Sequence, residues 1–300
     1  MNDASESRES PLPAGEWLFE AAAAALSRHL GTEAGELRID RLVVGVFATG
    51  VRLSDGRGGV AYTPPELVAQ ASRRILRGGL LRLRGLPALD VVKGRQAGPF
   101  APVVRLAALN ALSVPVLERL ARDGSAGDGE GEAFAPLVAG RRVCMVGAMV
   151  PLIKRLLRLG PAALTVADRK AETLAEVAGC SIVDVARLDE ALAACQTAVF
   201  TGASIANDSL PRLLAAVSPG AAVAVAGPTA GFVPDPLFDR GVTLVATTVV
   251  TDADEALDIL AEGGGLYPLF GRCLRKVNLL RPGPFPERRA CCGPCNTAVF

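Results

Sequence analysis

The chain has 300 residues, and this length favours two domains. Its 32 Lys and Arg residues nearly balance 31 Asp and Glu, which argues against a protein that binds nucleic acid through a basic surface. Hydrophobic residues make up 50%, a share that excludes a disordered chain. Because only 4% of residues are aromatic, we expect a core of Ala, Val and Leu, as in packed α/β layers.

The sequence predicts neither a membrane span nor a secretory signal. Its longest apolar runs, such as 221–226 and 242–246, are far shorter than the roughly 20 residues that a spanning helix needs. The N-terminus carries acidic residues where a secretory signal carries basic ones. The seven cysteines are an odd number and do not suggest a disulfide framework. We therefore expect a cytoplasmic protein that contacts neither membrane nor nucleic acid.

The N-terminal region begins with a polar stretch over residues 1–15, for which we expect a disordered tail. Apolar residues at helical spacing predict a helix over 16–30. Residues 41–53 are β-branched and apolar, and 59–62 can pair back on them as a β-hairpin. The connection over 54–58 contains glycines suited to such a turn.

Further helices are predicted after the hairpin. The sequence Thr63-Pro64-Pro65-Glu66 combines an N-cap, a proline for the first helical position and a capping-box glutamate. Helical segments follow near 86–92 and 101–112. Residues 16–123 therefore form a small α+β domain, and the Gly-, Ser- and acid-rich stretch 124–131 is the predicted linker.

Residues 132–282 alternate short, continuously apolar strands with helices. This pattern predicts a parallel sheet covered on both faces, a Rossmann-like α/β domain, before a Cys-rich tail over 283–300. The predicted strands are 142–146, 163–167, 181–183, 198–201, 222–226 and 242–245. The predicted helices are 151–159, 171–177, 188–194, 209–216 and 254–260.

The first strand-to-helix turn of this domain contains Gly147 as its only glycine, whereas a dinucleotide-binding turn carries three. Asp168 ends the next strand, where nucleotide-binding sheets place an acid that holds the ribose. Asp168 is therefore a candidate for binding a nucleotide-type cosubstrate such as S-adenosylmethionine. The alternative is that Asp168 only caps a strand or the helix after it.

Polar groups and glycines follow the fourth and fifth predicted strands. Those after the fourth strand are Thr201, Gly202, Ser204 and Asn207. Gly227 and Pro228 follow the fifth strand and face the same edge. Open α/β sheets bind ligands at the carboxyl ends of their strands, so we expect a ligand to contact this edge. A helix N-cap is the alternative role for Asn207.

Asn110 lies in an otherwise apolar helical segment and needs hydrogen-bond partners if it is buried. It either satisfies the backbone of a loop or points into a cleft between the domains. His29 is the only histidine, so a His-rich zinc site and a Ser-His-Asp triad are both improbable.

Three cysteines, Cys291, Cys292 and Cys295, stand close together near the end of the sequence. Thiols in this arrangement suit a soft transition metal such as Cu(I) or Zn, and Cys273 is a candidate fourth ligand. The spacing differs from that of a zinc ribbon, so the alternative is a tail that binds no metal. Cys144 lies in a predicted central strand and is expected to be a buried thiol.

Several stretches together resemble a known family. The C-terminal ones read VCMVGAMVPLIKRL, AVFTGASIANDSLPRLL and AVAGPTAGFVPDPLFDRGVTLVATTVVTDADEALDILAEGGG, and the N-terminal ones read VVGVFATGVRLSDGRGGVAYTP and RLAALNALS. The sequence is similar to the family called "putative heavy-metal chelation". That family combines a Rossmann-like domain with an N-terminal companion of enolase N-terminal-like fold. The terminal cysteines fall outside the family pattern.

The resemblance implies a ligand cleft between the two domains. The residues that match the family's motifs, and that would line this cleft, are Asn110, Gly147, Thr201, Gly202, Ser204, Asn207, Gly227 and Pro228. The turn around Gly58 and Gly59 would close it. This chain carries Ala148 and Met149 where family members often have larger polar or aromatic residues. If that position contacts the ligand, its chemistry differs from that of the family.

Three functions follow as expectations. In the first, the cleft binds a transition metal or a metal complex with a small chelator. In the second, the protein is a biosynthetic enzyme that uses a nucleotide-type cosubstrate such as S-adenosylmethionine. In the third, it binds a metabolite without chemistry. The Ala- and Leu-rich helices are also compatible with a homo-oligomer.

Overall fold

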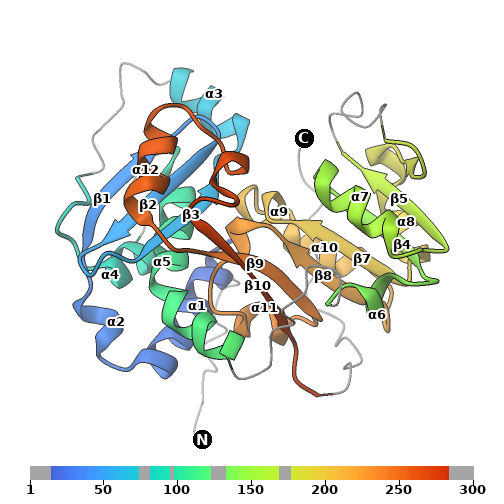
Figure 1. The fold of residues 1–300 in the computed structure, drawn as a ribbon, viewed down its shortest axis with the longest axis horizontal. Helices are drawn as coiled ribbons and strands as arrows, with labels where there is room; N and C mark the ends of the chain where they lie inside the picture. The colour runs from blue at the N-terminus through green and yellow to red at the C-terminus, as the bar shows by residue number, and fades with distance from the viewer. Residues whose placement is uncertain (1–14, 74–81, 95–97, 123–132, 169–176, 284–300) are drawn as a thin grey trace, which may run out of the picture.

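The computed structural model describes residues 15–73, 82–94, 98–122, 133–168 and 177–283 (Figure 1). These residues form two sheets, one antiparallel with three strands and one mostly parallel with seven. The predicted α/β class, with an α+β N-terminal region and a parallel sheet after it, is confirmed. The predicted linker at 124–131 and most of the predicted helix at 171–177 lie outside the described residues.

The three-stranded sheet consists of β1 (Ile39–Val44), β2 (Ala48–Leu53) and β3 (Gly58–Tyr62), paired antiparallel in chain order. The prediction of one long strand over residues 41–53 is wrong, because the chain turns between β1 and β2. Gly45 donates its N–H to the Ala48 carbonyl at 3.0 Å and closes this turn. The apolar residues on either side of the turn conceal it in the sequence.

Helices cover both faces of this sheet. On one face lies α5 (Ala101–Arg122), and on the other lies α12 (Ala253–Ala261), which comes from the far end of the chain (Figure 1). Successive strand residues point to opposite faces. A side chain on Gly59 would accordingly meet α5, whereas one on Gly58 would meet Ala253 of α12. A C-terminal helix therefore completes the N-terminal sheet.

Ion pairs hold α12 on the sheet. Arg52 of β2 bonds to Asp254 of α12 at 2.6 Å and also pairs with Asp40 of β1. Arg41 pairs with Asp258 one turn further along α12, at 2.7 Å. The hydrogen bond from Arg52 lowers the pKa of the Asp40 carboxyl. Beside these ion pairs, Leu257 and Leu260 of α12 pack on the same sheet at Gly50 of β2.

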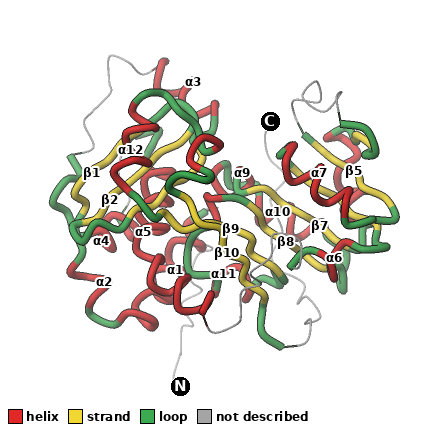
Figure 2. Tube along the Cα trace, in the orientation of Figure 1, coloured by secondary structure: helices red, strands yellow, loops and turns green. Residues whose placement is uncertain are grey.

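The remaining N-terminal helices are α1 (Glu16–Leu30), α2 (Glu33–Glu36), α3 (Pro65–Arg73) and α4 (Ala88–Lys93). Two of them, α1 and α4, pack directly on α5. By length and composition α5 resembles a membrane span, but 83% of its apolar window is buried inside the protein. It is the central helix of the core, where its neighbours enclose it (Figure 2).

The seven-stranded sheet has the order β10-β9-β8-β7-β4-β5-β6. All neighbouring pairs are parallel except β10 with β9. Numbered from β4, the parallel strands run 3-2-1-4-5-6, the order of doubly wound nucleotide-binding sheets. The strands are β4 (Arg142–Val146), β5 (Ala163–Ala167), β6 (Ser181–Ile182), β7 (Thr197–Thr201), β8 (Ala222–Ala226), β9 (Leu244–Val250) and β10 (Leu274–Leu280).

Alternate residues of these strands belong to two different apolar clusters, as expected for a sheet covered on both faces. Helices α6 (Ala135–Val138) and α7 (Val150–Arg158) pack on one face. The other helices of this part are α8 (Leu188–Ala194), α9 (Ala203–Ala206), α10 (Leu210–Ala216) and α11 (Asp235–Asp239), with short 3₁₀ turns η3 (Val185–Arg187), η4 (Pro228–Ala230) and η5 (Tyr267–Leu269).

Candidate functional site

The turns after β4, β7 and β8 come together at the carboxyl edge of the sheet. A Cβ on Gly147, whose φ is +96°, would lie 2.2 Å from Thr201 Oγ1, and one on Gly202 would lie 2.8 Å from Thr229 Cβ. Gly227 has φ +122° and adjoins Met149, whose methyl carbon would stand 3.5 Å from a Cβ there. These predicted site residues therefore lie close together, and glycine is required because the turns pack directly on one another.

Asn110 extends from α5 toward the same turns. Its Nδ2 donates to the carbonyl oxygens of Val60 at 2.7 Å, Pro228 at 3.1 Å and Thr229 at 3.3 Å. The hydroxyl of Thr229 in turn accepts a hydrogen bond from the Tyr62 N–H at 2.9 Å. Asn110 thus ties β3 to η4, which supports the structural interpretation of this residue.

Asp168 lies at the end of β5, as predicted. Its Oδ2 accepts a hydrogen bond from the N–H of Ala148 at 2.5 Å, directly after Gly147. The carboxylate therefore supports the β4–α7 turn. This contact takes one of the two oxygens that a ribose-binding acid would present to its ligand.

Ser204 lies in α9 and Asn207 directly follows this helix, in the segment that leads from β7 to α10. Ser204 Oγ donates to the Thr201 carbonyl at 2.8 Å. Asn207 Oδ1 accepts from the Ser209 N–H at 3.2 Å and from the Ser209 hydroxyl at 2.8 Å, so it bonds to the residue that precedes α10. Of the predicted site residues, Ser204 and Asn207 line the larger pocket described next, where a ligand could reach them.

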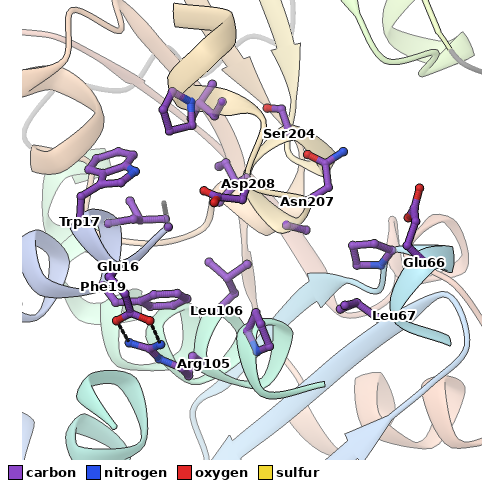
Figure 3. Close-up of a pocket in the computed structure, with 18 of the residues that line it drawn as sticks. Glu16, Trp17, Phe19, Glu66, Leu67, Arg105, Leu106, Ser204, Asn207 and Asp208 are labelled. Atoms are coloured by element: carbon purple, nitrogen blue, oxygen red, sulfur yellow. Dashed lines mark hydrogen bonds and ion pairs between the residues drawn. The ribbon is translucent and has the colours of Figure 1, made fainter. Parts of the chain in front are cut away.

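This pocket, which we call the Asp208 pocket, has a volume of about 410 Å³. It lies between α1, α3 and α5 of the N-terminal part and α9 and α10 of the parallel-sheet part (Figure 3). Its lining residues are Gly15, Glu16, Trp17, Leu18, Phe19, Pro64, Glu66, Leu67, Gln70, Pro102, Arg105, Leu106, Ser204, Ile205, Ala206, Asn207, Asp208, Leu210 and Pro211.

Arg105 is the one basic residue among the described residues that line the pocket, and its hydrogen-bonding groups are occupied. Its guanidinium donates to both carboxylate oxygens of Glu16, at 2.7 and 3.0 Å, and to the Val92 carbonyl at 2.8 Å. It also lies 3.8 Å from the centre of the Phe19 ring. Because Glu16 neutralises the charge of the buried Arg105, this arginine attracts an anionic ligand only weakly.

Two further carboxylates reach the pocket from different walls. Glu66 comes from α3 and Asp208 from the turn between α9 and α10 (Figure 3). Asp208 has φ +60°, a conformation that Asp and Asn tolerate better than other side chains. Partial desolvation by the pocket walls, followed by the negative charge of Glu16, raises the pKa of the Asp208 carboxyl.

Aromatic and aliphatic side chains form the remaining walls. Trp17, the only tryptophan in the chain, lines the pocket, and Arg240 stacks 3.7 Å from the centre of its ring. Leu67 and Leu106 add aliphatic surface (Figure 3). The pocket therefore combines an acidic polar set with an apolar lining, the composition of a site for a small organic ligand.

Within the described part of the chain, no group of three or more His, Cys, Asp or Glu side chains could hold a metal ion. His29 is engaged instead with Asp235, at 3.2 Å, and accepts from Arg119 at 2.9 Å. Cys144 is buried, and this burial, with the neighbouring Cys195, raises its pKa to about 12, so it stays protonated. The predicted metal ligands Cys291, Cys292 and Cys295 lie outside the described residues.

Sequence reasoning missed the main polar groups of the pocket: Glu16, Glu66, Arg105 and Asp208. One signal was present, because Arg105 is a charged residue in an apolar helical segment and such a residue needs a buried partner. Asp208 adjoins the predicted residue Asn207. The contribution of α1 could not be anticipated, since its place in the same pocket as α9 and α10 depends on the tertiary fold.

Comparison with known proteins agrees with this architecture. Two family models, both described as "Putative heavy-metal chelation", match residues 132–279 and 27–113. A structure of a DUF364-family protein of unknown function from Pyrococcus horikoshii is 18% identical, with a TM-score of 0.66 over 89% of this chain and 100% of the other. One from Desulfitobacterium hafniense is 20% identical, with a TM-score of 0.61 over 88% and 98%. No curated protein matches the sequence.

Proposed function

The chain belongs to the family described as "Putative heavy-metal chelation", and from this premise we propose that it binds a small, positively charged metal–chelator complex in the Asp208 pocket. The pocket lies where the two proposed domains, 16–123 and 132–282, meet. It includes Ser204 and Asn207 of the cleft predicted from the sequence.

The charge of the pocket carries this proposal. Among the described residues, three carboxylates line it, those of Glu16, Glu66 and Asp208, against the single guanidinium of Arg105. Since Arg105 is paired with Glu16, Asp208 supplies a negative charge that a ligand in the pocket meets. A cation is favoured there, and the apolar walls suit the organic part of a complex.

The donor set favours a complex over a bare ion. Soft heavy metals prefer thiolate and imidazole ligands, whereas the described pocket residues include neither Cys nor His. A chelator that occupies the coordination sphere of the metal removes the need for such protein ligands. The protein then recognises charge and shape, which carboxylates and apolar side chains can do.

The experiment uses an inert complex as probe. Tris(ethylenediamine)cobalt(III), a trication, would be titrated into the full chain with Trp17 fluorescence and calorimetry as readouts. Cobalt(III)–EDTA, an anion of the same metal, and Co²⁺ alone are the comparisons. We expect the trication to bind best, and we expect Asp208→Asn to weaken it about tenfold.

The matched control is Asp258→Asn, which removes an exposed carboxylate on α12 that does not line the pocket. It should leave the affinity for the trication unchanged. Equal binding of the cationic and anionic complexes, or full binding by Asp208→Asn, would contradict the proposal. Tight binding of Co²⁺ alone would contradict the preference for a complex.

A nucleotide-type cosubstrate such as S-adenosylmethionine remains the second candidate. It is favoured by the 3-2-1-4-5-6 strand order and by the position of Asp168 beside the Gly147 turn. Titration with S-adenosylmethionine would test it. Binding that is lost in Asp168→Ala but retained in Asp208→Asn would favour this candidate, and the absence of binding by the wild type would reject it.

A further inference from the structure

Three buried polar atoms have no hydrogen-bond partner among the described residues: Arg57 Nη1, Asn110 Oδ1 and Thr248 Oγ1. The last two line the same small cavity. Asn110 is 4% exposed and Thr248 is 6% exposed. A buried polar atom without a partner costs roughly 1–3 kcal/mol, so such atoms are rare in folded proteins. Two of them therefore call for an explanation.

The orientation of the Asn110 amide is fixed by its other end. Its Nδ2 faces the carbonyl oxygens of Val60, Pro228 and Thr229. If the amide were turned over, Oδ1 would face these three oxygens and all the hydrogen bonds would be lost. Oδ1 therefore has to find a donor on the side away from β3 and η4 backbone carbonyls.

Asn110 and Thr248 line the same small cavity, which has a volume of about 10 Å³. Its other walls are Gly58, Gly59, Val60, Val114, Pro228, Gly231, Val249 and Val250. A space of this size accepts about one water molecule and nothing larger. None of the lining residues carries a titratable side chain, so the site favours a neutral occupant over an ion.

We propose that this cavity binds one structural water molecule. The water donates a hydrogen bond to Asn110 Oδ1 and shares another with the Thr248 hydroxyl, which can both donate and accept. Backbone groups in the walls can complete its set of partners. Because Asn110 belongs to α5 and Thr248 to β9, the water joins the central helix to the parallel sheet.

The variant Thr248→Val tests this assignment, because the proposal predicts that its Tm falls and the alternative predicts that its Tm rises. Valine has the shape of threonine without the hydroxyl. If Thr248 bonds a water, the change removes a hydrogen bond, and Tm should fall by about 2–4 °C. If the hydroxyl is buried without a partner, its removal relieves a penalty, and Tm should rise. An unchanged or raised Tm would overturn the proposal.

Thr247→Val is the matched reference on the same strand. The Thr247 hydroxyl donates to the Gly227 carbonyl at 3.1 Å. Thr247→Val therefore shows how far Tm falls when a buried hydroxyl loses a hydrogen bond. A fall in Tm of similar size for both variants supports the water.

A crystal structure of the unmodified protein, at a resolution that shows ordered solvent, gives a second test. It does not depend on whether either variant folds. Density for one water within hydrogen-bond distance of both Asn110 Oδ1 and Thr248 Oγ1 would support the site. An empty cavity, or a water bonded to neither atom, would overturn it.

Discussion

Gly59 of β3 lies directly against the backbone of α5: a Cβ on this residue would stand 2.2 Å from the carbonyl oxygen of Ala107 and 2.3 Å from the nitrogen of Ala111. Neither atom belongs to a flexible side chain, so the contact cannot be relieved by a rotamer change. The sheet and the central helix therefore approach as closely as they do because residue 59 has no side chain.

We expect Gly59→Ala to destabilise the protein by several kcal/mol, because α5 must move away from the sheet to admit the methyl group. Thermal unfolding measured by circular dichroism would show this. Gly35→Ala is the control, since a Cβ there meets nothing within 4 Å. A Gly59→Ala variant as stable as Gly35→Ala would disprove the close approach.

The Glu16–Arg105 pair should behave as one unit. Arg105→Met removes the arginine from the half-buried Glu16 carboxylate, and we expect a loss of about 1–3 kcal/mol in the free energy of unfolding. Adding Glu16→Gln should restore part of this loss. Urea unfolding of both single variants and the double variant would measure the coupling. Additive losses would show that the two groups act independently.

Asp208 should make both stability and binding depend on pH. Its raised pKa means that ionisation of the folded protein is unfavourable, so stability is greatest below the ordinary carboxyl pKa and falls as pH rises through the raised value. Asp208→Asn should therefore raise Tm at neutral pH and lose this advantage in acid. Asn also tolerates the positive φ, a contribution that is independent of pH.

In the same variant the affinity for a cationic complex should be low at every pH. In the wild type this affinity should weaken as the pH is lowered. The weakening should begin at a higher pH than it would for an aspartate of ordinary pKa. Paired melting and titration series from neutral to acidic pH would show both effects. A stability difference that stays constant across the series would mean that Asp208 has an ordinary pKa.

Cysteine reactivity offers a separate check on the metal question. Cys144, Cys195 and Cys273 are buried, and burial raises the pKa of both Cys144 and Cys273, whereas Cys180 is half-buried. We expect iodoacetamide to modify Cys180 well before these three in the folded protein, because only an accessible thiolate reacts. Peptide mass spectrometry would compare the rates. Rapid modification of Cys144 would reopen it as a metal ligand.

The parallel sheet was largely predictable from the sequence, because its strands are short and apolar on both faces. Strands 142–146, 163–167 and 222–226 have the predicted bounds. The division between β1 and β2 was not predictable from periodicity, since Val46 and Phe47 in the turn are as apolar as the strands around them. Both side chains are 57% exposed.

The candidate site was predictable only in part. Residues that follow strands, such as Ser204 and Asn207, can be placed at the carboxyl edge by topology alone. Glu16 and Arg105 are far apart in the sequence, and their contact with one another depends on how α1 packs against α5. No local pattern encodes that packing, so the acidic character of the pocket became visible only in three dimensions.

The position of α12 has a consequence for how the protein is made. The three-stranded sheet is complete once Tyr62 has been synthesised, yet the helix that covers its second face ends at Ala261. During translation this face, which carries Ala48 and Val60, must wait until α12 has emerged from the ribosome. The exposed strands are an aggregation risk in that interval, and a nascent chain arrested before α12 should recruit chaperones that the finished protein does not need.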